Sequence, residues 1–136
     1  MTLIGLDVGE RRIGVAVSDK LGKTAQPFET IDRDGRATER LAELARSTAA
    51  ERLVVGLPLL MDGSEGTQAR LVKEFAEGLA GALDLPVAYV DERLTTREAE
   101  AVLTQGGVKR GRKKEASDRL AAALILRTYM ESLPEE

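Results

Sequence analysis

Residues 1–9 read M-T-L-I-G-L-D-V-G, and this stretch decides how the rest of the chain is interpreted. Its leucine, isoleucine and valine side chains predict a buried strand over Thr2–Val8, ended by Gly9. Side chains of a strand alternate, so the apolar residues at 4, 6 and 8 share one face and Asp7 lies on the other, between Gly5 and Gly9. A buried carboxylate is costly unless something pairs with it, so Asp7 either caps the turn that follows or faces a ligand.

Two more strands are expected to follow in a meander. The segment G-E-R at 9–11 interrupts the first strand, and R-I-G-V-A-V-S over Arg12–Ser18 alternates again, which predicts a hairpin. Pro27–Ile31 is a candidate third strand. Asp34 and Gly35 then break the chain, and Asp34 can cap a helix that begins there.

The rest of the chain alternates helices with short apolar strands. The spacing of apolar residues, and the turn residues between them, define the elements. In chain order we expect a helix over 36–49, a strand over 53–57, a Gly-rich loop, a helix over 67–82, a strand over 87–90, a helix over 95–105, a basic loop ending at residue 114, and a helix over 115–133. Both later strands are wholly apolar, as in a sheet covered on both faces.

The order β-β-β-α-β-α-β-α-α defines the expected fold class. We expect one α/β domain over residues 1–136, built on a mixed five-stranded sheet with helices on both faces. Three antiparallel strands come first and parallel strands follow, which is the RNase H-like arrangement. A fold of this kind does not by itself define a function.

Composition limits the chemistry that the chain can perform. It contains no cysteine and no histidine, so it lacks thiolate nucleophiles, the usual zinc ligands and the commonest general base. Any acid–base or metal chemistry must rely on carboxylates, water and hard cations. The N-terminus has no signal-peptide pattern, and no apolar run approaches the length of a membrane span, so we expect a soluble cytoplasmic protein.

Positive charge is concentrated in one segment, although the whole chain carries a net charge of −3. Between residues 93 and 119, Arg and Lys outnumber Asp and Glu by eight to four. Such a run is either a solvated loop or, beside a catalytic site, a set of phosphate contacts. The candidate phosphate contacts are Arg11, Arg12, Arg93, Lys109, Arg110, Arg112, Lys113 and Lys114. With only two Phe and two Tyr, the chain is not built to stack bases on aromatic rings.

Three acidic positions stand out against this pattern. Asp91 and Glu92 follow a buried strand at its carboxyl end, where ligands bind in open α/β sheets, unless they merely pair with nearby arginines. Their side chains point to opposite sides, so at most one of them faces Asp7. Asp118 lies on the apolar face of the last helix, where it could instead simply stabilise the positive end of the helix dipole.

If Asp7, one of Asp91 and Glu92, and Asp118 converge, they make an oxygen-ligand site for Mg²⁺ or Mn²⁺. A pair of such ions clamps the attacking and leaving oxygens in phosphodiester hydrolysis and needs no histidine. The Gly-rich loop G-L-P-L-L-M-D-G-S-E-G over residues 56–66 is not a P-loop, because it lacks the G-K-[ST] ending. Its backbone N–H groups could bind a phosphate or could only cap the next helix.

Five motifs together resemble the YqgF/RuvX family over nearly the whole chain. They are G-L-D-V-G-x-R-R-I-G-V-A-V-S-D, V-V-G-L-P-L, M-D-G-S-E-G, D-E-R-L-T-T and S-D-R-L-A-A-A. The resemblance implies an RNase H-like nuclease related to Holliday junction resolvases, whose members are also described as maturing the 5′ end of pre-16S rRNA. It also implies that Asp7, Glu92 and Asp118 form the catalytic, metal-binding triad. Leu60 departs from the family, which usually has Asn at that position, and this puts a polar contact of the loop in doubt.

The leading hypothesis is therefore a Mg²⁺- or Mn²⁺-dependent nuclease that acts in rRNA processing and ribosome biogenesis. The alternatives are a resolvase of branched DNA in recombination and repair, and a non-catalytic nucleic-acid-binding domain. An actin-like ATPase is disfavoured, because that fold needs two lobes around its nucleotide. A resolvase should be a homodimer, since symmetric cleavage needs two sites, whereas a trimming nuclease can be a monomer.

Overall fold

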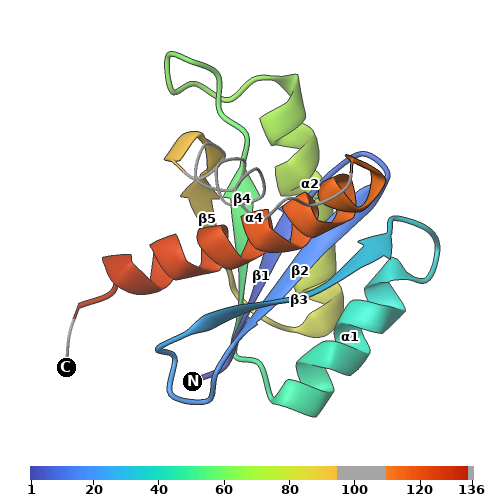
Figure 1. Cartoon of the computed structure of the whole chain (residues 1–136), viewed down its shortest axis with the longest axis vertical. Coiled ribbons are helices and arrows are strands. Elements are labelled where there is room, and N and C mark those ends of the chain that lie inside the picture. Colours follow the sequence, from blue (N-terminus) through green and yellow to red (C-terminus); the bar gives the residue numbers. More distant parts are fainter. Residues whose placement is uncertain (95–109, 135–136) are drawn as a thin grey trace.

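The computed structural model describes residues 1–94 and 110–134 (Figure 1). Its five strands form one sheet in the order β3-β2-β1-β4-β5. The strands are β1 (Leu3–Val8), β2 (Arg12–Ser18), β3 (Ala25–Asp32), β4 (Arg52–Leu57) and β5 (Val87–Asp91). The helices are α1 (Ala37–Thr48), α2 (Thr67–Leu83) and α4 (Arg110–Ser132), with a 3₁₀ turn, η1, over Glu92–Leu94.

The predicted mixed sheet is confirmed. Strands β1, β2 and β3 pair antiparallel, whereas β4 pairs parallel to both β1 and β5. The hairpin closes where the Gly9 N–H donates to the carbonyl of Arg12 over 2.8 Å. The α1 boundary differs slightly, because Asp34 accepts from the backbone N–H of Arg36 in a turn before the helix rather than acting as its N-cap.

Two helical layers cover the sheet. Helices α1 and α2 pack on one face around a core that includes Ile4, Leu6 and Val8 of β1. Helix α4 lies across the other face, where it packs on Leu3, Ala16 and Val54 (Figure 1). The face predicted for the apolar residues of β1 is therefore correct, and Asp7 lies on the α4 side of the middle strand.

Glycines allow α4 to lie close to the middle strands. A Cβ at Gly5 would come within 2.8 Å of the Ala122 carbonyl oxygen. A Cβ at Gly14 would overlap the backbone carbonyl of Asp118. Because these obstacles are backbone atoms, the helix could accommodate a larger residue only by moving away from the sheet.

The start of the last helix was predicted five residues too late. Helix α4 begins at Arg110 rather than at residue 115, so the basic residues from 110 to 114 belong to its first turns and not to a loop. Arginine and lysine are good helix formers, and Gly111 falls in the first turn, where it interrupts no long hydrogen-bonded stretch. The helix predicted over 95–105 lies outside the described residues.

Helices in the described ranges also bear on membrane association. None of those within residues 1–94 and 110–134 combines the length and the apolar character needed to cross a bilayer.

Replacing Gly14 by alanine tests the close approach of α4. We expect Gly14→Ala to lower the free energy of unfolding by about 1–3 kcal/mol, since overpacking displaces the helix backbone. Urea denaturation at constant m-value measures the change. Gly78→Ala in α2 is the matched control, because nothing lies within 4 Å of an added Cβ there. That substitution should instead raise stability by about 0.5–1 kcal/mol. Equal effects of the two substitutions would contradict this account of the packing.

Candidate functional site

Asp7 occupies the middle of the sheet. It lies near the end of β1, directly across from Gly14 of β2 in the antiparallel register. Its side chain is partly buried on the face that α4 covers. The missing side chain at Gly14 leaves the space beside the carboxylate to the helix backbone at Asp118.

Glu92 reaches Asp7 from the far side of β4. It follows β5 as the first residue of η1, and β4 separates β5 from β1. A Cβ at Gly56 of β4 would come within 2.6 Å of Glu92 Oε1, so only glycine leaves room for this side chain. Through that space the Glu92 carboxyl group forms a hydrogen bond with the carboxyl group of Asp7.

Burial and mutual repulsion change the titration of this acid pair. Burial, the hydrogen bond to Asp7 and the negative charges of Asp7 and Asp91 raise the pKa of Glu92 to about 8. Burial also raises the pKa of Asp7, while the hydrogen bond with Glu92 lowers it. At neutral pH Glu92 therefore stays protonated, and its carboxyl O–H donates the hydrogen bond to the Asp7 carboxylate.

Asp118 comes close to Gly14 through its backbone, and its side chain pairs with Arg12. It lies in α4 where the helix contacts Gly14. Its carboxylate forms a salt bridge with Arg12, whose Nε lies 3.4 Å from Oδ2. Within the described ranges no three acidic side chains lie close enough to hold one ion. The structure thus brings together two of the three predicted acids directly and places the third beside Arg12.

Asp91 and Arg93, the two neighbours of Glu92, bind each other. Arg93 Nη2 donates to Asp91 Oδ2 over 2.7 Å, and Arg93 Nε lies 3.0 Å from each carboxylate oxygen. The pairing considered as the alternative for this acidic segment therefore holds for Asp91. Arg93 Nη1 donates to the carbonyl of Met61 over 3.0 Å. The guanidinium predicted to contact phosphate is thus engaged within the protein.

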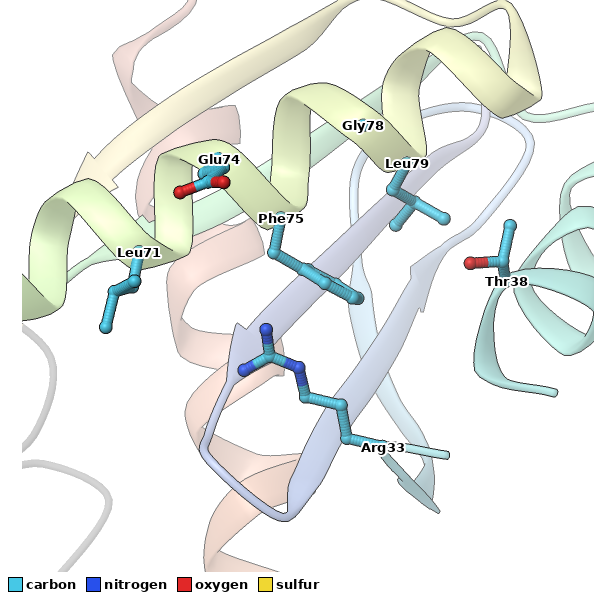
Figure 2. Close-up of a pocket in the computed structure, with 7 residues that line it drawn as sticks. All are labelled: Arg33, Thr38, Leu71, Glu74, Phe75, Gly78 and Leu79. Atoms are coloured by element: carbon cyan, nitrogen blue, oxygen red, sulfur yellow. The ribbon is translucent and has the colours of Figure 1, made fainter. Parts of the chain in front are cut away.

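Arg11 and Arg12 lie together at the β1–β2 turn. With Gly9, Glu10 and Asp118 they line one surface hollow. Arg33 holds this turn with two hydrogen bonds. Its Nη1 donates to the Gly9 carbonyl over 3.1 Å, and its backbone N–H donates to the Arg11 carbonyl over 2.8 Å. The Arg33 guanidinium lies over the Phe75 ring, 4.4 Å from its centre. Figure 2 shows the two side chains next to each other.

The remaining predicted phosphate contacts belong to the start of α4. Arg110, Arg112, Lys113 and Lys114 occupy its first turns, four to eight residues before Asp118. Lys109 lies outside the described residues. The chain direction of α4 therefore brings this basic segment toward the β1–β2 turn, because Asp118 pairs with Arg12 there.

Sequence reasoning missed three features that shape the site. Gly56 stands within an otherwise apolar strand, V-V-G-L-P, and a glycine in a strand interior signals close approach of another group. Gly14 gives the same signal within I-G-V. The contact between Arg93 and Met61 joins residues 32 positions apart, and no local pattern indicates it.

Relatives of the chain carry one consistent name. A protein of Lactococcus lactis subsp. cremoris (strain SK11), named "Putative pre-16S rRNA nuclease", is 48% identical over 134 residues, covering 96% of this chain and 94% of that protein. A protein of Syntrophus aciditrophicus with the same name is 44% identical over 138 residues, covering 100% of this chain and 92% of that protein.

Solved structures of junction resolvases share the fold. Thermus thermophilus RuvC in complex with a Holliday junction substrate matches with a TM-score of 0.58 and 20% identity, covering 96% of each chain. The fowlpox virus resolvase bound to Holliday junction DNA matches with a TM-score of 0.55 and 12% identity, covering 99% of this chain and 100% of that one. The family model described as "RuvX: Holliday junction resolvase" matches residues 1–132. With these matches over nearly its whole length, the chain belongs to the RuvX family.

Proposed function

We propose that this chain is a divalent-metal-dependent nuclease that hydrolyses phosphodiester bonds at the 5′ end of precursor 16S rRNA. One observation carries the chemistry: Asp7 of β1 and Glu92, which follows β5, share a hydrogen bond in a partly buried place although β4 separates the two strands. The names of the relatives at 44–48% identity support the substrate.

The acid pair fits a hard divalent cation. Mg²⁺ and Mn²⁺ prefer oxygen ligands, and these two carboxyl groups repel each other once both have lost their protons. A cation between them would remove that repulsion. Asp7 and Glu92 would be its ligands, and Asp118 would be a third if its carboxylate left Arg12.

The chain's own residues would then position the substrate. A bound divalent ion supplies an activated water and balances the charge that develops on the phosphate. Arg11 and Arg12, at the turn beside Asp118, would attract the neighbouring phosphates. The basic residues at 109, 110, 112, 113 and 114 would extend this attraction along the nucleic acid backbone.

Resolution of branched DNA is the second candidate, and the description of the matching family model favours it. The same acid pair would serve this reaction. The difference lies in the assembly, because paired symmetric cuts need two sites and therefore a homodimer, whereas 5′ trimming can be done by a monomer.

Cleavage of two substrates side by side tests the proposal. We expect the wild-type protein, with Mg²⁺ or Mn²⁺, to cut a 5′-extended pre-16S rRNA at a defined site and to leave a four-way DNA junction intact. Asp7→Asn should slow the cleavage on the order of 100-fold or more, because the proposed divalent cation loses one of its carboxylate ligands.

Glu43→Gln, which removes an exposed carboxylate from α1, is the matched control and should cut like wild type. Paired nicks in the junction, with the RNA left uncut, would show that branched DNA rather than RNA is the substrate. A folded Asp7→Asn variant that cuts as fast as wild type would refute the assignment of the site.

The raised pKa of Glu92 predicts how stability depends on pH. Above about pH 5 the glutamate of the unfolded chain is ionised while the folded pair retains its proton, so the metal-free protein should lose stability as pH rises toward 8. Glu92→Gln should flatten this decline, as measured by urea midpoints at each pH. Mg²⁺ should stabilise wild type more at about pH 8 than at pH 5, because its ligands must be deprotonated. A pH profile that Glu92→Gln leaves unchanged would contradict this electrostatic account.

A further inference from the structure

The loop between β4 and α2 contains a tight turn over residues 60–64. The Leu60 N–H donates to the carbonyl of Ser64 over 2.9 Å, and the Gly63 N–H donates to the carbonyl of Leu60 over 2.8 Å. Asp62 Oδ1 accepts from the Ser64 backbone N–H over 2.9 Å and from its hydroxyl over 2.6 Å. Gly63 has a φ of +87°, which suits glycine. These contacts hold the 60–64 turn in one shape.

Arg93 ties this turn to the end of β5. Its guanidinium grips the Asp91 carboxylate with Nε and Nη2 and donates with Nη1 to the carbonyls of Met61 and Leu60, over 3.0 and 3.4 Å. Asp91 and Arg93 stand on either side of Glu92 in the chain. The 60–64 turn is therefore held by the two residues that flank the acid pair's glutamate.

The 60–64 turn presents apolar side chains to solvent. Met61, at the tip of the turn, is 96% exposed, and the neighbouring Leu60 is 52% exposed. The contacts that hold the turn therefore leave its largest apolar side chain open to solvent, where a partner can reach it.

The chemistry of the 60–64 turn is unsuited to phosphate. The charged side chain within it is the carboxylate of Asp62, which repels phosphate. The N–H groups of Gly63 and Ser64, which could have bound an anion, donate to Leu60 and Asp62 instead. Apolar side chains such as methionine do, however, pack against the faces of bases and insert between them.

We propose that Met61 contacts a base of the nucleic acid substrate, and that the Asp91–Arg93 ion pair positions the 60–64 turn for this contact. The inference rests on the proposed nuclease function and adds to it how a base is held at the turn that Asp91 and Arg93 position. Arg93 is then a positioning residue and not a phosphate contact. Leu60, which is 52% exposed next to Met61, widens the apolar tip of the turn.

The two roles for Arg93 predict opposite effects of one substitution. If Arg93 binds phosphate, Asp91→Asn removes a competing carboxylate and should strengthen nucleic acid binding. If Arg93 holds the turn, Asp91→Asn loosens it and should weaken binding. Arg93→Lys separates the roles as well, because lysine keeps the positive charge but lacks the planar guanidinium whose Nε and Nη2 bind the Asp91 carboxylate while Nη1 binds the Met61 carbonyl.

Fluorescence anisotropy with a labelled 5′-extended pre-16S rRNA fragment provides the test, with Ca²⁺ in place of Mg²⁺. We expect Met61→Ala, Asp91→Asn and Arg93→Lys each to weaken binding about tenfold, or ~1.4 kcal/mol. The dependence of binding on salt should stay the same, because no phosphate contact is lost. Met61→Ala combined with Arg93→Lys should be no weaker than the single variants, since both remove one contact.

Leu21→Ala is the matched control, because Leu21 is also apolar and 74% exposed but lies in the β2–β3 turn. It should bind like wild type. In RNA carrying 2-aminopurine, the fluorescence of the contacted base should change on binding wild type and not on binding Met61→Ala.

Three results would count against the inference. Unchanged binding by Met61→Ala would overturn the base contact. Stronger binding by Asp91→Asn, with affinity kept in Arg93→Lys, would return Arg93 to the phosphate contacts. Failure of the wild-type protein to bind either the RNA or a four-way DNA junction would overturn the proposed function and this inference together.

Discussion

The close approach of α4 to the middle strands is the constraint on which the rest of the structure depends. Because Gly5 and Gly14 carry no side chain, the backbone of α4 rests directly on β1 and β2. This contact fixes where Asp118 stands and how deeply Asp7 is covered. Gly56 does the same on the next strand, where its missing side chain leaves the space that Glu92 occupies. The shape of the site therefore depends on the absence of side chains at Gly5, Gly14 and Gly56.

That arrangement has an electrostatic cost. Two carboxyl groups held in contact in a partly buried place disfavour ionisation, which raises the pKa of Glu92 to about 8. Strongly shifted carboxyl groups without a structural need are characteristic of functional sites. A divalent cation offsets the same repulsion, so a feature that destabilises the metal-free fold at alkaline pH is what the proposed activity requires. Arg12 gives Asp118 a partner of opposite charge beside this site.

Much of the fold could be predicted from the sequence, because alternation and helical spacing are local properties. They identify β1 with its buried and open faces, the hairpin, and the parallel strands that follow. The start of α4 could not be predicted, because the dense charge of residues 110–114 favours a solvated loop although most of these residues are good helix formers. Spacing also could not choose between Asp91 and Glu92. That choice depends on Gly56 and on the ion pair with Arg93, which are contacts between distant segments. The hydrogen bond between Arg93 and the Met61 carbonyl also joins distant segments, so no local pattern predicts it.

The most direct test of the account is Mn²⁺ binding, measured by electron paramagnetic resonance on the wild-type protein and on matched carboxylate variants. The account predicts that wild type binds Mn²⁺, that Asp7→Asn and Glu92→Gln each lose most of this binding, and that Asp91→Asn retains it. The last variant removes a carboxylate adjacent in sequence that is committed to Arg93. If Glu92→Gln bound Mn²⁺ as tightly as wild type, the acid pair would not be the metal site and the central claim would be wrong.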